Sequence, residues 1–431
     1  MTEVPIIRTI EDLGLVSHPQ RSALSNEMHV RKLPAISAPA RLMQILILHN
    51  SSRVEREHEL IAAFCGKSAS DLANQNYLSC HVQDVHLIRE RHTEFSSFMF
   101  IKPGPFDDPF DPATFAMVPR GWFNGLGDEV VRATQLAFAD AMEKGRIAES
   151  FCEEDLVLCD VADGAGRLWS DFRLHDDGFG RLLLVDNGLT GQEAALVIQR
   201  LQELGNYRNM ALLGLPVAQR LTPKVTDFEH QLSELTAAIA CDDSDDNSLL
   251  HDLSTLSAAM AAVIAETHYR MSASRAYAKI SSDRLTSLRV DRVPGFQTLG
   301  DFTDRRLLPA VRTCISFSDR LEDLSRRVAW TSALLRTRVD TALSRQNRDL
   351  LRSMDQRTQL QLRLQEAVEG LSVVAISYYL LSLSAYILRG IEHVTAVSHD
   401  VVLAALAPII LIFVSYSLHR FRQRVQSSDA P

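Results

Sequence analysis

The sequence lacks the short motifs that identify most enzyme classes. It contains no Walker sequence, nucleophile elbow or dinucleotide-binding fingerprint. Gly164-Ala-Gly166 has no further glycine at phosphate-loop spacing, so it predicts a turn. None of the six cysteines forms a Cys-x-x-Cys pair, whereas thiolate zinc sites need such clustering. We therefore interpret the cysteines as reduced thiols, and neither an enzyme class nor a cofactor is indicated.

The chain also lacks an excess of basic charge and a long apolar run at its start. Its formal net charge is −9. Nucleic acid attracts a basic surface, so we expect no nucleic acid as a partner. The opening MTEVPIIRTIEDLGL carries three acidic residues and is unlike a secretory signal. We therefore expect residues 1–369 to remain in the cytoplasm.

Two long uncharged runs lie near the end of the chain. Residues 370–388 read GLSVVAISYYLLSLSAYIL, and residues 401–418 read VVLAALAPIILIFVSYSL. A helix of about nineteen residues spans roughly 28 Å, close to the ~30 Å hydrocarbon core of a bilayer. We therefore expect a pair of transmembrane helices joined by an outer loop at 389–400. The alternative is a buried helical hairpin in a soluble core, but such helices usually have a polar edge.

Arginine residues flank these runs unequally. Arg420, Arg422 and Arg424 lie in a basic tail at 419–431, whereas the connecting loop contains Arg389 and no other arginine or lysine. Because the cytoplasmic flanks of membrane helices are enriched in Arg and Lys, both termini are predicted to be cytoplasmic. The expected location is the bacterial inner membrane, with the lipid bilayer as a partner.

One stripe of hydroxyl groups runs along the first uncharged segment. Ser372, Tyr379, Ser382 and Tyr386 recur at intervals of seven, three and four residues, which places them on one helical face. This pattern favours helix–helix packing through hydrogen-bonding residues. The alternative is the polar lining of a pore in an oligomer.

The patterns in residues 1–215 predict an α/β domain. ARLMQILILHN is typical of a buried strand. DLVLCDVA, GRLWSDFRLH and GRLLLVDNG are short runs bounded by Gly and Asp, as expected for adjacent strands. Thr190 and Glu193 have the spacing of a capping box that opens a helix.

Helical patterns dominate after Pro216. Residues 216–300 predict a helical region, including a second capping box at Thr226 and Glu229. The overall fold class is therefore an α+β cytoplasmic domain followed by a mainly α-helical region, a long stalk helix and a C-terminal two-helix transmembrane hairpin.

The stalk helix is predicted for residues 301–369 because this segment contains no glycine and only one proline. Its length would be near 100 Å at helical rise. Part of its apolar seam repeats every eleven residues, which favours a straight or slightly right-handed coiled-coil assembly. We therefore expect a homo-oligomer, although an exposed face or a hydrated axis would also account for the polar residues in the seam. The seam residues that fit this period are Val328, Val339, Leu343, Leu350 and Met354.

Glu90, His92 and Glu94 form a candidate metal or polar site. If they alternate along one strand, their side chains share a face, where two carboxylates and an imidazole would bind a metal or move a proton. The alternative is a polar sheet face, with Arg89 and Arg91 on the opposite side.

Four stretches of the sequence are distinctive: HPQRSALSNEMHVR, ERHTEFSSF, VADGAGRLWSDFRLH and the long segment from Leu334 to Tyr379. They resemble a bacterial family of uncharacterised membrane-anchored proteins, the domain of unknown function 3422. The resemblance covers nearly the whole chain. It implies an inner-membrane location and no established activity.

The predicted architecture is also similar to that of CorA-type divalent-cation channels, which are homopentamers with stalk helices around a pore. The Gly-Met-Asn hallmark of those channels is absent, because the corresponding place reads AYILRGIEH. Three hypotheses follow. The first is a membrane-tethered, non-enzymatic protein that self-associates, the second a CorA-like channel or transporter, and the third a membrane-anchored enzyme that uses Glu90, His92 and Glu94.

Overall fold

The chain forms two compact units, residues 1–331 (unit 1) and 332–431 (unit 2). The predicted boundaries near residues 215 and 300 both fall inside unit 1. The computed structural model describes residues 10, 13, 15–30, 33–48, 54–68, 76–119, 121–125, 129–141, 147, 149–241, 245–391 and 399–428. The side chains of 26–30, 54, 124–125, 390–391, 399 and 421–428 are outside this description.

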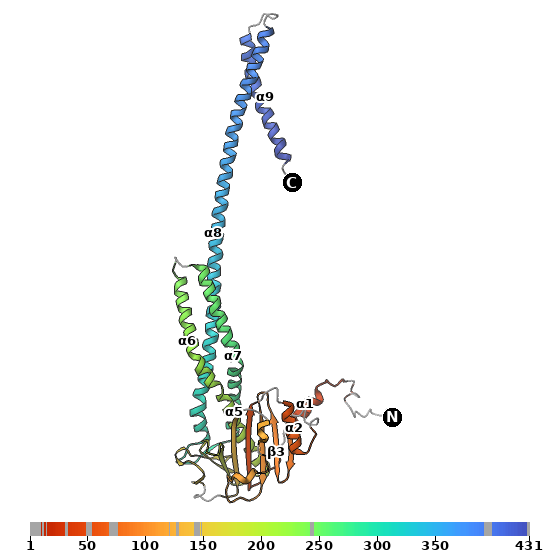
Figure 1. Cartoon of the computed structure of the whole chain (residues 1–431), viewed down its shortest axis with the longest axis vertical. Helices are drawn as coiled ribbons and strands as arrows, with labels where there is room; N and C mark the ends of the chain where they lie inside the picture. Colours follow the sequence, from red (N-terminus) through yellow and green to blue (C-terminus); the bar gives the residue numbers. More distant parts are fainter. Residues whose placement is uncertain are drawn as a thin grey trace, which may run out of the picture. The chain divides into compact units, whose positions relative to one another are not determined.

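Unit 1 contains a β-sheet (Figure 1). Its nine strands have the order β2-β3-β4-β1-β5-β8-β7-β6-β9. Neighbouring strands are antiparallel except β5 and β8, which run parallel. The strands are β1 (Ala40–Leu48), β2 (Tyr77–Val82), β3 (Val85–Arg91), β4 (Phe95–Pro103), β5 (Val130–Ala139), β6 (Val157–Val161), β7 (Gly166–Ser170), β8 (Gly180–Asp186) and β9 (Asp291–Arg292).

The predicted strands are confirmed. β1 is buried on both faces, as its apolar run indicates. The three runs bounded by Gly and Asp form β6, β7 and β8, which are adjacent in the sheet. Gly164 has a φ of 88°, in the left-handed region, and lies in the turn between β6 and β7.

Helices cover both faces of the sheet. Alternate residues of β1 face opposite sides, so Leu42 packs in the cluster with helix α5 (Gly191–Leu212), while Ile45 packs in the cluster with helix α2 (Val54–Cys65). Short η3 (Pro112–Phe115), η4 (Trp122–Gly125) and η5 (Glu153–Asp155) helices lie in the connections, and α1 (Arg21–Val30) precedes β1.

Helix α5 begins at the predicted capping box. The Thr190 hydroxyl accepts from the Glu193 amide, and the Glu193 carboxylate accepts from the Thr190 amide. The second predicted box is wrong, because α6 (Gly214–Ile239) is already helical at Thr226 and continues through Pro223. Thr226 instead donates from its hydroxyl to the Thr222 carbonyl within the helix.

Helices α6 and α7 (Asp246–Ser287) pack beside the first part of α8 (Leu299–Ile391). Glu229 of α6 forms a bidentate ion pair with Arg320 of α8, with contacts of 2.8 and 3.0 Å. Buried side chains that include Phe317, Leu321 and Leu324 show that α8 belongs to the core of unit 1 over these turns. The predicted stalk therefore begins as a packed core helix.

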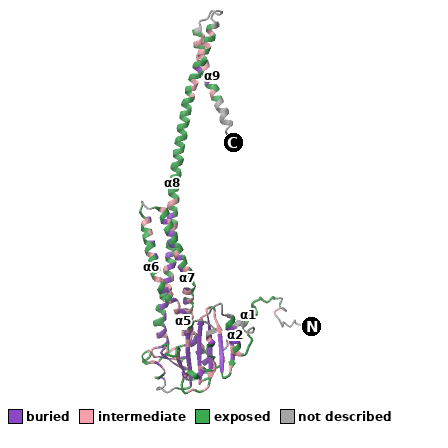
Figure 2. Ribbon diagram, viewed as in Figure 1, coloured by how far each residue is buried: buried purple, intermediate pink, exposed green. Residues whose placement is uncertain are grey.

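Unit 2 consists of the rest of α8 and helix α9 (His399–Ser428), which turns back in the opposite direction (Figure 1). Residues 340–368 of α8 are exposed on all sides (Figure 2). Both predicted membrane segments are helical, at 370–388 and 401–418. Most of the predicted outer loop, residues 392–398, lies outside the described residues.

The interpretation of all six cysteines as reduced thiols is wrong in this structure. Cys65, at the end of α2, forms a disulfide with Cys80 in the edge strand β2. Their spacing of 15 residues gave no Cys-x-x-Cys signal, and the fold brings them together. The other four cysteines form no disulfide among the described residues, and they are Cys152, Cys159, Cys241 and Cys314.

Candidate functional site

The predicted Glu90, His92 and Glu94 face does not form, because β3 ends at Arg91 and the chain turns before β4. Glu90 and His92 do remain together, with 3.8 Å between a carboxylate oxygen and Nε2. They lie beside a cavity of only about 20 Å³ under α5, and the imidazole stacks on Phe95 at 4.3 Å. As predicted, Arg89 points to the opposite side.

Glu94 lies apart from Glu90 and His92 and faces α7. Its carboxylate pairs with Arg270, and its side chain is 7% exposed. Burial, and then the hydrogen bond to Glu94, raise the pKa of the Tyr277 hydroxyl. Among the residues that the structure describes, no three His, Cys, Asp or Glu side chains are placed to hold a metal ion. Glu94 thus links the sheet to α7, whereas Glu90 and His92 lie beside α5.

The hydroxyl stripe lies on α8 as the spacing predicts. Tyr379 and Tyr386 are exposed, while Ser372 and Ser382 are half-buried. The Ser372 hydroxyl donates to the Val368 carbonyl at 2.8 Å, one turn earlier in the helix. What the stripe packs against, or whether it lines a pore, stays a prediction.

Of the predicted topology anchors, Arg420 has a described side chain. Its guanidinium lies 6.0 Å from the centre of the Tyr416 ring. Arg422 and Arg424 lie within α9, but their side chains are outside the described part of the chain.

A cavity of about 400 Å³ lies where the parallel strands β5 and β8 begin. Residues that follow β7 and the last part of α5 complete its wall. Of the described residues, four arginines line it together with apolar and neutral polar side chains, and none of the lining residues is a carboxylate. The arginines are Arg132, Arg173, Arg181 and Arg208.

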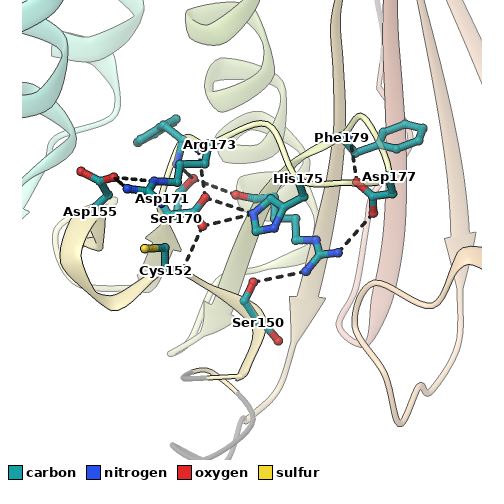
Figure 3. Close-up of polar contacts among 11 residues, drawn as sticks. Ser150, Cys152, Asp155, Ser170, Asp171, Arg173, His175, Asp177 and Phe179 are labelled. Atoms are coloured by element: carbon teal, nitrogen blue, oxygen red, sulfur yellow. Dashed lines mark hydrogen bonds and ion pairs between the residues drawn. The ribbon is translucent and has the colours of Figure 1, made fainter.

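Two of these four arginines have carboxylate partners outside the cavity. Arg173 pairs with Asp155 at 2.5 Å, and Arg181 pairs with Asp177 at 3.2 Å. Figure 3 shows the contacts of Arg173 together with those of its neighbours.

Arg132 lies under α5 with its side chain surrounded by amide groups. Its Nη1 donates to Gln44 Oε1 and Gln202 Oε1, both at 2.7 Å, and to Asn206 Oδ1 at 2.9 Å. The guanidinium fits against the backbone of Gly205, where an added Cβ would come within 2.7 Å of three of its atoms. Arg132 is only 8% exposed. Burial, and then the nearby Arg208, lower its pKa to about 9.

Arg208 lies against aromatic rings. Its guanidinium is 4.8 Å from the centre of the Phe172 ring and 5.5 Å from that of Phe302, and the two rings stack at 4.4 Å. Cations are attracted to such ring faces. Its Nη1 is buried without a hydrogen-bond partner. Burial, and then Arg306, lower the pKa of Arg208 to about 10.

A buried carboxylate and a histidine lie next to this cavity. Asp171 accepts from the amides of Cys152 and Arg173 at 3.0 and 3.1 Å, and from His175 Nε2 at 3.1 Å (Figure 3). This pairing orients the imidazole. The Cys152 thiol points away from the ring in Figure 3, so the group lacks the nucleophile of a Cys-His-Asp triad.

Sequence reasoning missed Arg132, Arg208 and Gly205. One signal was available, because Arg132 shares its strand face with Leu136 and Phe138, both in the core. A charged residue on an inward-facing position calls for a partner or a ligand. The pairing of α5 with β5, which brings Arg208 to the same place, has no local signature.

Comparison with known proteins gives one assignment. No curated protein matches the chain. The comparisons likewise do not support the similarity to CorA-type channels. The family described as "Protein of unknown function (DUF3422)" matches residues 16–425, nearly the whole chain. The chain therefore belongs to this family.

Proposed function

We propose that this protein is a membrane-tethered module that self-associates, with unit 1 on the cytoplasmic side of the bacterial inner membrane. One observation carries the proposal. The most apolar stretches of α8 and α9 are long enough to cross a bilayer, yet only 6% of their residues are buried. Apolar surface of this extent normally has a partner, and lipid is the partner that a helix of this length and composition fits.

Helix α7 is the third helix whose apolar stretch is long enough to span a bilayer, but its stretch is more buried. In its stretch, 28% of the residues are buried, and Leu253 and Leu256 belong to the core of unit 1. Hydropathy alone therefore selects α7, α8 and α9 as candidate membrane spans. Packing in the core of unit 1 explains the apolar residues of α7. The arginines around the other two helices support cytoplasmic termini.

Cell fractionation tests the membrane anchor. The full chain is expected to remain in the membrane pellet after an alkaline wash, and a variant that lacks residues 366–431 is expected in the soluble fraction. A variant that lacks only 421–431 is the control and keeps both apolar stretches. Full-length chain in the soluble fraction would overturn the proposal.

Protease treatment of spheroplasts tests the orientation. With a sealed inner membrane, unit 1 is expected to resist digestion until detergent is added. Digestion of unit 1 in sealed spheroplasts would contradict cytoplasmic termini.

The exposed part of α8 supports self-association. Leu343, Leu350 and Met354 are 56% to 63% exposed and lie on one side of a helix. A single helix gains little from apolar side chains in water, whereas a second copy of the same helix would cover them. The eleven-residue spacing suits helices that run together with little supercoil.

Light scattering of the purified chain in detergent tests this part of the proposal. A mass of two or more chains is expected after correction for the detergent. Leu343→Glu with Leu350→Glu should reduce it to one chain, because charges would face each other across the seam. Gln356→Glu, exposed on the other side of the helix, is the matched control. A monomeric wild-type chain would overturn self-association and leave the anchor unaffected.

A further inference from the structure

In the cavity between β5, β8 and α5, two arginines have no carboxylate partner among the residues that the structure describes. Arg132 donates to three neutral amide oxygens, and Arg208 lies on aromatic rings with Nη1 buried and unbonded. Buried arginines are normally paired with carboxylates, because an unpaired charge away from water is unfavourable. Among the described residues, neither guanidinium thus pairs with a carboxylate, and the nearby buried Asp171 pairs with His175 instead.

Another buried arginine of unit 1 shows the usual arrangement. Arg89 has no exposed surface, and the Glu57 carboxylate lies 3.3 Å from its Nε. The fold therefore supplies a carboxylate for a buried guanidinium on the α2 side of the sheet. On the α5 side, Arg132 and Arg208 line a cavity instead.

The packing around Arg132 indicates a built site. Three amide side chains, from β1 and α5, hold one nitrogen, and Gly205 leaves room for the rest of the guanidinium. Such constraints fix the direction of a side chain that is more than nine-tenths buried. Fixed guanidinium groups are suited to oxyanions because their N–H groups form a planar fork.

We propose that this cavity binds a small phosphate-bearing molecule, with Arg132 and Arg208 as the groups that receive the phosphate. Two uncompensated cations match the two negative charges of a phosphate monoester better than the single charge of a carboxylate. The cavity volume of about 400 Å³ exceeds that of phosphate alone and lies within the range of small-molecule sites. Leu174, Leu182 and Phe172 would contact the organic part of the ligand.

The lowered pKa values of both arginines agree with this assignment. Burial, and then a neighbouring arginine (Arg208 for Arg132, Arg306 for Arg208), disfavour their charged forms, but pKa values of about 9 and 10 leave both groups protonated at neutral pH. A bound dianion would relieve the repulsion between them. Ligand binding should therefore stabilise unit 1, and removal of one charge should not destabilise the empty protein.

Isothermal titration of the full chain in detergent tests the proposal. The probes are inorganic phosphate and glycerol 3-phosphate, with acetate at equal ionic strength as the control. We expect saturable binding of at least one phosphate probe and none of acetate. Tighter binding of glycerol 3-phosphate would identify an organic monoester as the ligand class, whereas equal affinities would indicate free phosphate. No saturable binding of either probe at millimolar concentration would overturn the proposal.

Arg208→Gln and Arg220→Gln separate binding from structure. Arg220 forms an exposed ion pair with Glu266 on another surface and serves as the control. We expect Arg208→Gln to weaken phosphate binding at least tenfold and to leave the melting temperature of the ligand-free protein unchanged or higher. A lower melting temperature with unchanged phosphate affinity would show a structural arginine and overturn the proposal. If Arg208→Gln fails to fold, Arg208→Lys, which keeps the charge but loses the planar fork, should still weaken binding.

Discussion

Helix α7 and the second half of α8 have similar apolar stretches but different surroundings. The stretch in α7 packs into unit 1, where Leu253 and Met260 are almost completely buried. The stretch in α8 leaves Leu371, Tyr379 and Leu383 exposed. Composition and length alone place both helices among the candidate membrane spans.

Burial therefore separates a core helix from a candidate span where hydropathy does not. The stability of unit 1 can also be measured separately from that of unit 2. The three tryptophans are Trp122, Trp169 and Trp330, all within unit 1, so intrinsic fluorescence reports the unfolding of that unit.

The largest expected effect comes from arginine substitutions in the two helices. Leu256→Arg would bury an unpaired charge in α7 and should destabilise unit 1 by more than about 4 kcal/mol. Leu383→Arg, at a position 59% exposed, should change unit 1 by less than about 0.5 kcal/mol and weaken membrane retention. Fluorescence-detected urea unfolding and an alkaline wash measure the two effects. Equal losses of unit 1 stability would remove the distinction between the helices.

Alanine substitutions sharpen the same contrast without introducing charge. Leu253 has 0% exposure, so Leu253→Ala should lower the unfolding free energy of unit 1 by about 2–5 kcal/mol through lost burial and a cavity. Leu364 is 68% exposed, and Leu364→Ala should leave that free energy within about 0.5 kcal/mol of wild type. Urea titrations at fixed detergent concentration give both values. A stable Leu253→Ala protein would show that α7 does not contribute to the core.

The disulfide gives a third contrast, because it lies only in unit 1. Joining Cys65 to Cys80 closes a loop of about 15 residues, for which chain entropy predicts roughly 3 kcal/mol of stabilisation. A Cys65→Ser, Cys80→Ser double variant should lose about this amount in fluorescence-detected unfolding. Cys241→Ser, at an exposed position, is the control. The helical signal of unit 2 should not change.

A smaller effect is expected from pH. Burial, and then the stacked His81, lower the pKa of His86 to about 4 from its usual 6.5. The unfolded chain therefore binds the proton first, and stability is lost as pH falls from 6.5 towards 4. At pH 5 the unfolding free energy is lower than at neutral pH by about 2 kcal/mol because of this histidine. His86→Gln should reduce the acid sensitivity of unit 1 by that amount relative to a His251→Gln control, and an unchanged profile would contradict it.

The parts of the fold that were predictable from sequence depend on local patterns. The apolar run of β1 and the capping box at Thr190 predict structure correctly because a few neighbouring residues determine it. The box pattern at Thr226 failed because helix α6 had begun twelve residues earlier, and the Thr226 hydroxyl accepts from Arg320 of α8 instead of capping a helix. Local signals lose to tertiary packing at such positions.

The candidate site depends on contacts between distant residues. Arg132 and Arg208 are 76 positions apart, and only the packing of α5 on β5 brings them to one cavity. The opposite happened with the predicted polar site. The spacing of Glu90, His92 and Glu94 suggested that they lie together, but the chain leaves the strand after Arg91 and Glu94 lies apart. A pattern of period two cannot reveal where a strand ends.

The bond between Cys65 and Cys80 also makes unit 1 a natural reporter of its own compartment. Thiols of cytosolic proteins are kept reduced, whereas those facing the periplasm are oxidised. Alkylation of acid-quenched cells, before and after reduction, would show whether Cys65 and Cys80 are in a disulfide in the cell. Bonded cysteines in living cells would place residues 65 and 80 on the outer side, against the arginine pattern, and free thiols would place them inside. The redox state of Cys65 and Cys80 thus reports on which side of the bilayer unit 1 lies, independently of the arginines that flank the apolar helices.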